Sequence, residues 1–195
     1  MKAFPIRERV EEALAASAFV KLLLVQRCVP QIETIAKELI RALRAGRRVF
    51  LIGNGGSAAD AQHIAGELEG RFKRNRRALP ALALTTNTST LTALGNDLGY
   101  EHTFSRLIEA HVRKGDVLIA ISTSGQSPNI LEAVKRARKI GAVTVGFTND
   151  SGGKLRHLVD HCLQVPSTDT QRVQECHIAV GHAVCEAVEE ALFEK

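Results

Sequence analysis

Two short segments of small and hydroxyl-bearing residues have the composition of anion-binding loops. Each follows an apolar run typical of a buried strand and precedes a run typical of a helix. Small residues let the backbone approach a ligand closely. The N-terminus of the following helix offers free N–H groups and a positive dipole end, which suit a phosphate. The two segments are Gly53-Asn54-Gly55-Gly56-Ser57 and Ser122-Thr123-Ser124-Gly125-Gln126-Ser127.

The motifs in these loops differ from those of nucleotide-binding proteins. Neither loop is followed by Gly-Lys-Ser/Thr, as a Walker A motif requires, and the first has Ala58 where GxGxxG has its last glycine. An ordinary strand-to-helix turn with a capping serine is the alternative interpretation. Capping needs one hydroxyl, however, and the second loop carries four. The sequence therefore favours phosphate binding and predicts no nucleotide or redox cofactor.

A second group of polar residues lies on two segments with helical periodicity. His63 and Glu67 are four residues apart and share a helix face. Gln174 and His182 are eight apart, about two turns, and lie on a similar side of another helix. Such groups can bind a divalent metal or act as a general acid and base. A surface ion pair or a buried structural histidine shows the same pattern, so spacing alone leaves these alternatives open.

The segments around these residues alternate between strand and helix. Strands that are apolar throughout indicate a parallel sheet buried on both faces. Their alternation with helices predicts an α/β fold, a three-layer, doubly wound parallel sheet flanked by helices. Ligands bind such sheets outside the carboxyl ends of the strands, where both loops lie. The expected strands are 48–52, 81–85, 116–121, 143–147 and 162–165, and the expected helices are 57–71, 129–139 and 170–193, with short helical pieces between 89 and 111.

A helical extension, residues 1–45, precedes this core. Helical periodicity runs from Arg7 to Leu43. We expect two helices broken near Pro30, because proline suits the first turn of a helix but not its middle. The apolar stretch from Ala13 to Val25 would suit packing against another subunit. Nothing divides the rest of the chain, 46–195, so the 195 residues are expected to form a single domain.

Composition and charge narrow the possible partners and compartment. The balance of 26 Lys+Arg against 21 Asp+Glu gives a net charge of +5, which suits an anionic ligand but also nucleic acid. The densest basic run, Arg71 to Arg77, has one aromatic residue and no nucleic-acid-binding motif, so we expect no nucleic-acid partner. The four cysteines lack CxxC spacing, and no signal peptide or membrane-length apolar stretch is evident. These features predict a cytoplasmic protein without a membrane partner.

Five motifs in a fixed order, spread over about Ile32 to Glu190, resemble those of the phosphoheptose isomerase family of the sugar isomerase (SIS) domain superfamily. They are Gly53-Asn-Gly-Gly-Ser57, Asp60-Ala-Gln-His63 with Glu67, Gly95-Asn-Asp97, Ser122-Thr-Ser-Gly-Gln-Ser127, and Arg172-Val-Gln174 with His177 and His182. The resemblance implies a homotetramer with sites at subunit interfaces and one zinc ion per subunit.

The reaction implied by the resemblance is an aldose–ketose isomerisation, which is an intramolecular oxidoreduction. It converts sedoheptulose 7-phosphate into D-glycero-D-manno-heptose 7-phosphate, the first step of the ADP-heptose route to the lipopolysaccharide core. By resemblance, the phosphate lies on Ser122, Thr123, Ser124 and Ser127. The other substrate-binding residues are Asn54, Gly55, Gly56, Ser57, Asn96, Asp97 and Gln174, and the metal ligands are His63, Glu67, Gln174 and His182.

Such an isomerisation moves a proton between C1 and C2 through an enediol, so it needs a base for the carbon proton and a group that shuttles or polarises the oxygens. The resemblance supports Glu67 and His182 as the catalytic pair, without deciding which takes the carbon proton. Glu67 cannot be a tight metal ligand and a free base at the same instant.

Three alternatives share the fold. A non-catalytic SIS protein that binds a replication initiator could dispense with Glu67 and His182, and their joint retention argues against it. An isomerase of another phosphosugar would carry the same phosphate loop, so the loop does not separate the two. A sugar-phosphate-sensing transcription regulator needs a DNA-binding module, for which the first 45 residues are a poor candidate.

Overall fold

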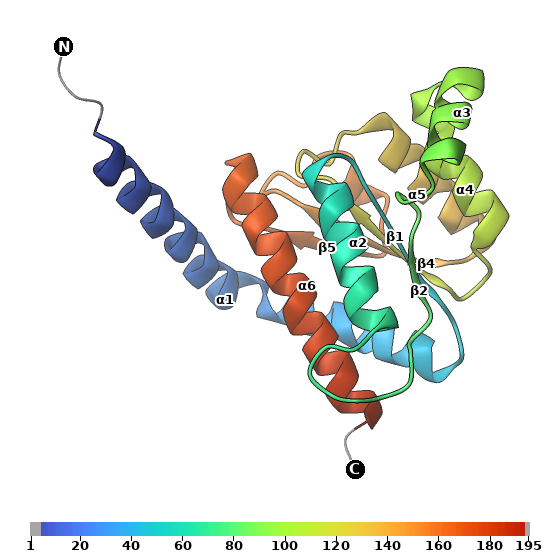
Figure 1. Cartoon of the computed structure of the whole chain (residues 1–195), viewed down its shortest axis with the longest axis horizontal. Coiled ribbons are helices and arrows are strands. Elements are labelled where there is room, and N and C mark those ends of the chain that lie inside the picture. The colour runs from blue at the N-terminus through green and yellow to red at the C-terminus, as the bar shows by residue number, and fades with distance from the viewer. Residues whose placement is uncertain (1–4, 194–195) are drawn as a thin grey trace.

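The computed structural model describes residues 5–193, which form a five-stranded parallel sheet flanked by helices (Figure 1). The strands lie in the order β2-β1-β3-β4-β5, and every neighbouring pair is parallel. Their bounds are β1 Val49–Gly53, β2 Ala81–Ala83, β3 Val117–Ile121, β4 Val143–Thr148 and β5 His161–Gln164. The predicted α/β class and all five expected strands are confirmed, although β2 ends two residues earlier than expected.

Six α-helices and two short 3-10 helices connect or flank the strands within the described residues. The helices expected after β1, β3 and β5 are present, and the expected short pieces between β2 and β3 are α3, η1 and α4. The bounds are α1 Ile6–Arg44, α2 Gly56–Glu69, α3 Thr88–Leu98, α4 Thr103–His111, α5 Pro128–Ile140 and α6 Thr170–Phe193, with η1 Tyr100–His102 and η2 Leu155–His157.

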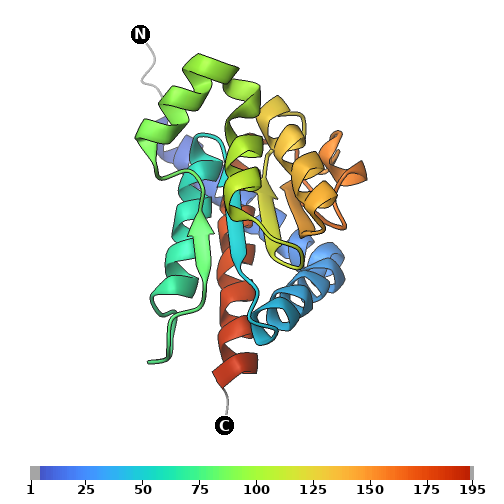
Figure 2. The ribbon, with the colours of Figure 1, turned by 90° about the vertical axis from the view of Figure 1, so that its right-hand side faces the viewer.

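Helices cover both faces of the sheet (Figure 2). The core has two parts, one on each face. Along β1 the side chains alternate: Val49 and Leu51 pack with α1, α2 and α6, whereas Phe50 and Ile52 pack with α4 and α5. This alternation follows from the two-residue period of a strand. Because both faces are covered by helices, every residue of β1 is buried, which explains its uninterrupted apolar sequence.

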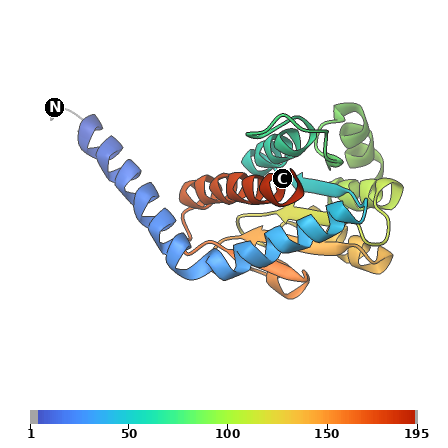
Figure 3. The same cartoon turned by 90° about the horizontal axis from the view of Figure 1, so that it is seen from below.

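The N-terminal extension differs from expectation: α1 is one helix of 39 residues with Pro30 inside it, so the predicted break into two helices was wrong. Proline lacks the N–H that would bond four residues back, which bends a helix without necessarily ending it. Figure 3 shows the change of direction. Contacts on both sides of Pro30 hold the helix, since Cys28 Sγ reaches the Gln164 carbonyl on β5 (3.4 Å) and Ile35 is fully buried.

The first half of α1 projects from the rest of the chain (Figure 1). Its exposed apolar side chains are Ile6, Val10, Leu14, Phe19, Leu22, Val25 and Val29. By length and composition alone, α1 is apolar enough to cross a membrane, and 17% of its most apolar window is buried in the chain. The expectation that all apolar stretches fall far short of a membrane span therefore does not hold for α1.

Candidate functional site

The first small-residue loop joins β1 to α2 through a turn that only glycine fits. A Cβ on Gly53 would lie 2.4 Å from the Ser57 carbonyl oxygen, and Gly55 has a φ of +53°. L-residues with side chains rarely adopt such a φ. Gly55 and Gly56 are exposed, and α2 begins without a side-chain cap. The N–H groups of Ser57 and Ala58 donate to the Asn54 carbonyl at 3.0 and 3.3 Å, so the turn satisfies them within its own backbone.

The second loop, between β3 and α5, keeps its hydroxyls away from helix capping. Ser127 occupies the N-cap position of α5 but makes no capping hydrogen bond. Its Oγ lies 3.2 Å from Ser122 Oγ instead, and Ser124 Oγ accepts from the Gln126 N–H at 3.2 Å. The alternative interpretation, a turn that needs its serine as a cap, is therefore not what the structure shows.

A neighbouring loop after β4 holds the second loop in place. The Asn149 N–H donates to the Thr123 carbonyl at 2.9 Å, and the Leu155 N–H donates to the Gly125 carbonyl at 3.0 Å. Gly125 has a φ of +61°, and a Cβ there would lie 2.2 Å from the Gly152 carbonyl oxygen. Main-chain contacts with the loop after β4 therefore position the backbone of the second loop.

Two asparagines connect the loops across β1 and β3, which are neighbours in the sheet. Asn54 and Asn129 exchange amide hydrogen bonds of 2.9 Å in both directions, and the Tyr100 hydroxyl donates to Asn54 Oδ1 at 3.1 Å. They line a cavity of about 270 Å³ together with Ser127. Sequence reasoning missed Asn129 and Tyr100. The pairing of β1 with β3 brings Asn129 to Asn54, and the packing of the 3-10 helix η1 against α5 brings Tyr100 there.

Asn96 and Asp97, the other residues predicted to contact the sugar, lie near the end of α3. Both are exposed, and Asn96 Nδ2 donates to Asp97 Oδ1 at 2.8 Å. The contacts described for them tie them to each other and not to the two loops. Their role in substrate binding stays a prediction.

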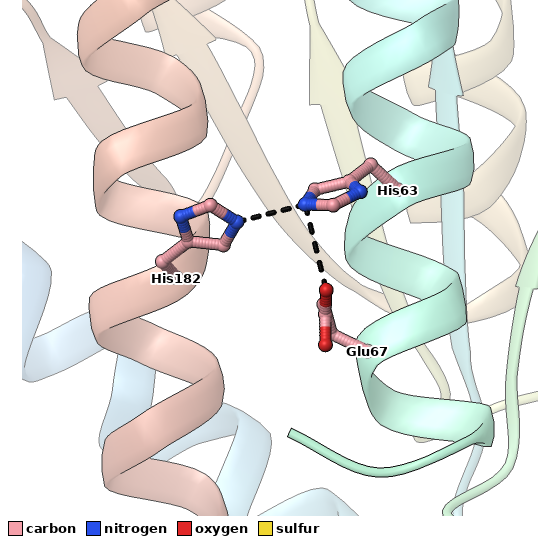
Figure 4. A group of neighbouring side chains, drawn as sticks. All are labelled: His63, Glu67 and His182. Carbon is pink, nitrogen blue, oxygen red and sulfur yellow. Dashed lines mark hydrogen bonds and ion pairs between the residues drawn. The ribbon is translucent and has the colours of Figure 1, made fainter. Parts of the chain in front are cut away.

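The predicted catalytic residues come together where α2 and α6 lie side by side (Figure 4). His63 Nε2 is 2.8 Å from His182 Nε2 and 3.5 Å from Glu67 Oε1. Ligand atoms of all three residues lie within 4.8 Å of one another. We call these three residues the His–Glu–His cluster. Glu67 and His182 thus lie in one site.

Small residues allow the two helices to approach this closely. A Cβ on Gly181 would lie 2.6 Å from Ile64 Cδ1, so Gly181 on α6 receives the Ile64 side chain of α2. The neighbouring residues, His63 and His182, are then brought within reach of each other. His63 is 48% exposed and Glu67 23% exposed, so the cluster is open to solvent in the single chain.

Gln174 lies apart from the His–Glu–His cluster. Its Nε2 is 2.6 Å from the position that a Cβ on Gly56 would take, which places it beside the first loop. It precedes His182 by eight residues, about 12 Å along α6. The structure therefore brings together three of the four predicted metal ligands and puts the fourth beside predicted substrate-binding residues.

Burial raises the pKa of two groups near the cluster, Cys185 and Asp60. Burial raises the pKa of the Cys185 thiol to about 12, with a further contribution from the Glu67 carboxylate. Burial also raises the pKa of Asp60, against the influence of His63. Among the described residues, Asp60 Oδ2 is buried without a hydrogen-bond partner. All four cysteines are free thiols.

The donor set of the cluster fits zinc. Zinc accepts imidazole nitrogen and carboxylate oxygen at about 2.0–2.2 Å. Two nitrogens and one oxygen within 4.8 Å of one another need only small side-chain rotations to reach a common ion. Three protein ligands would also leave a fourth position free.

Comparisons with known proteins identify the family of the chain. The SIS domain family model matches residues 20–149. A phosphoheptose isomerase of Aquifex aeolicus is 52% identical over 188 residues, covering 96% of this chain and 98% of its own. One of Rhodospirillum rubrum is 53% identical over 178 residues, covering 91% and 93%.

Solved structures show the same fold. A phosphoheptose isomerase from Neisseria gonorrhoeae has a TM-score of 0.91 at 40% identity and covers 95% of this chain and 99% of its own. One from Francisella tularensis has a TM-score of 0.93 at 32% identity and covers 96% and 100%. The chain belongs to the phosphoheptose isomerase family of SIS-domain proteins.

Proposed function

We propose that this chain isomerises sedoheptulose 7-phosphate to D-glycero-D-manno-heptose 7-phosphate, the step that opens the ADP-heptose route. The observation that carries the proposal is the His–Glu–His cluster on α2 and α6. His63 follows Gly56 by seven residues, so the cluster lies about 10 Å along α2 from the first loop. A seven-carbon sugar held at the first loop would reach the cluster over a distance of this order.

The phosphate would bind at the second loop. Ser122, Thr123, Ser124 and Ser127 supply hydroxyls there, and the N-terminus of α5, which begins at Pro128, supplies a favourable dipole. Asn54, Gly55, Gly56 and Ser57 of the first loop, with Asn96, Asp97 and Gln174, would contact the sugar. The placement of Gln174 beside Gly56 supports its part in this group.

Glu67 and His182 would move the proton between C1 and C2. A positioned carboxylate and imidazole within one site can remove a carbon proton and shuttle a proton between the sugar oxygens. His63 Nε2 faces His182 Nε2 at 2.8 Å, so His63 would help to orient the His182 ring within the cluster.

Zinc would be held by His63, Glu67 and His182, with Gln174 reaching the ion only after its side chain leaves Gly56. When bound, zinc supplies a Lewis acid that polarises a sugar carbonyl oxygen. Glu67 would then bind metal or accept a proton at different moments, as its two predicted roles require.

The apolar side of α1 supports assembly into a homotetramer. Seven large apolar side chains between Ile6 and Val29 are exposed in the single chain. A contiguous exposed apolar surface of this kind marks an interaction site. Burial of this surface in a tetramer, and not in a bilayer, is part of the proposal, as is a cytoplasmic location.

An isomerisation assay against five-, six- and seven-carbon ketose phosphates, with and without a chelator, tests the proposed function. We expect turnover with sedoheptulose 7-phosphate and none with unphosphorylated sedoheptulose, because the second loop would bind the substrate through its phosphate group. A preference for a pentulose or hexulose phosphate would contradict the proposed substrate. Full activity after metal removal would contradict the zinc assignment.

A further inference from the structure

A charged pair is buried at the end of the α2–α6 contact that lies away from the loops. Arg76 Nε donates to Glu189 Oε1 at 2.8 Å, and each side chain is 2% exposed. Charged groups are rarely buried to this extent unless they are paired and hydrogen-bonded. Nothing in the proposed chemistry uses either residue directly.

Glu189 ties the segment that leaves α2 to α6. Its carboxylate accepts backbone N–H bonds from Phe72 (3.1 Å), Lys73 (2.7 Å) and Arg74 (2.9 Å). Desolvation raises the pKa of Glu189, but these three donors and Arg76 outweigh it and hold the pKa below its ordinary value. The carboxylate is therefore charged and fully bonded at neutral pH.

Arg76 closes the C-terminal end of α2. Its guanidinium donates to the carbonyls of Glu67 (2.8 Å), Leu68 (2.9 Å) and Gly70 (3.2 Å). The last carbonyls of a helix have no partner within it, and a cation there interacts favourably with the helix dipole. One of these carbonyls belongs to Glu67 itself, so Arg76 holds the backbone of a proposed catalytic residue.

The pair also reaches the other proposed catalytic residue. Glu189 follows His182 by seven residues on α6, and the bond to the Phe72 N–H places the Phe72 ring 5.7 Å from the His182 ring. We propose that Arg76 and Glu189 are positioning residues that set the separation of Glu67 and His182. This inference rests on the proposed function, because the separation of Glu67 and His182 affects turnover only if both residues act on the substrate.

The test compares the kinetics of Glu189→Gln and Arg76→Lys with those of the wild type. An amide keeps the shape of Glu189 but turns a donor toward the backbone N–H groups, and lysine keeps the charge without the guanidinium fork. We expect kcat to fall about 10- to 100-fold, the usual cost of losing an outer partner of a metal or catalytic residue. KM should stay unchanged, because the phosphate loops lie at the opposite end of α2.

Ile108→Ala is the control that shows how a loss of stability alone affects kcat. Ile108 is fully buried on α4, on the other face of the sheet. It should lower stability without lowering kcat. If Glu189→Gln does not fold, Glu189→Asp keeps the charge and shortens the reach to the 72–74 backbone. A raised KM with normal kcat, or a kcat loss no larger than that of Ile108→Ala, would overturn the inference.

Binding of Co²⁺ alone, followed by visible absorption, separates this inference from the proposed function. We expect Glu189→Gln to bind Co²⁺ about 10- to 100-fold more weakly than the wild type. A wild type that isomerises no ketose phosphate would contradict the proposed function and leave this measurement valid. Equal Co²⁺ binding by the wild type and Glu189→Gln, at any strength, would contradict the positioning role.

Discussion

The two parts of the candidate site are built differently. At the carboxyl edge of the sheet, each loop is a run of consecutive residues whose backbone and hydroxyls are proposed to bind the substrate. At the α2–α6 contact, the groups are side chains from segments more than a hundred residues apart, such as His63 and His182. The edge therefore depends on local backbone conformation, whereas the helix contact depends on how two helices are held together.

This difference predicts different effects of substitutions in the two parts. A substitution in a loop is expected to alter the shape of a backbone turn and to weaken phosphate binding. A change at the helix contact alters the separation of reacting groups and acts on turnover, and misplacement by about 1 Å can cost about 10²-fold in rate. Phosphate binding and turnover should thus respond to separate sets of substitutions.

The largest expected effect lies at the helix contact. Glu67→Gln and His182→Gln each remove a proposed acid or base, so kcat should fall about 10²- to 10⁴-fold in an isomerisation assay. Both variants should fold normally, because neither side chain is fully buried. Glu69→Gln, an exposed change on the same helix, is the matched control and should leave kcat unchanged. Near wild-type turnover by either site variant would rule out its catalytic role.

His177 links the two parts and should make stability depend on pH. It is fully buried on α6, its Nε2 lies 3.2 Å from the Thr148 carbonyl at the end of β4, and its Nδ1 has no described partner. Burial lowers the pKa of His177 from 6.5 to about 4, despite the opposing bond to Thr148. Protonation would leave a buried charged N–H without an acceptor.

Because the folded-state pKa is the lower one, the unfolded chain binds more protons between pH 6.5 and about 4. The stabilisation is complete above pH 6.5 and is lost as the pH falls to about 4, by roughly 3 kcal/mol at about 1.36 kcal/mol per pKa unit. Urea unfolding of wild type and His177→Gln across this range measures it. The two curves of unfolding free energy against pH should converge toward low pH, and parallel curves would contradict the prediction.

At the sheet edge, Gly125→Ala should disturb backbone conformation. Its φ of +61° disfavours a side chain, and the new Cβ would lie 2.2 Å from the Gly152 carbonyl oxygen. We expect a loss of about 2 kcal/mol in unfolding free energy, together with a raised KM. Gly66→Ala is the control, since nothing lies within 4 Å of its Cβ position and alanine favours a helix interior by about 1 kcal/mol. Equal stability of the two variants would show that the loop turn does not need glycine.

The same difference explains what the sequence could predict. The strands and both loops were predictable, because a buried strand is apolar throughout and a loop motif is contiguous. The His63–Glu67 pairing followed from helical spacing, but its meeting with His182 rested on resemblance. Gln174 was assigned to the metal by resemblance as well, and only the register of α2 against α6 shows it beside Gly56.

Other features depended on long-range contacts that no local pattern contains. Pro30 predicts a helix break locally, yet contacts on both sides of it keep α1 continuous. The basic run from Arg71 to Arg77 was weighed as a nucleic-acid site, whereas Arg76 is buried against Glu189. Asn129 gave no signal, since its partner Asn54 lies 75 residues away. Tertiary packing overrides local preference in each case.

The smallest expected effect is that of Ser124→Ala. This variant tests most directly whether the sheet edge and the helix contact have separate roles in binding and turnover. Ser124→Ala removes one predicted hydroxyl donor to the phosphate, and a hydrogen bond to a charged group contributes about 1.5–3 kcal/mol. The phosphate does not change during the reaction, so its binding is equal in ground and transition states and the loss should appear as a KM raised about 10-fold or more with kcat retained. Ser105→Ala is the matched control, because the Ser105 hydroxyl donates to the His102 carbonyl, outside both loops. A defect in kcat alone would mean that Ser124 acts on turnover, and the division between a binding edge and a reacting helix contact would not hold.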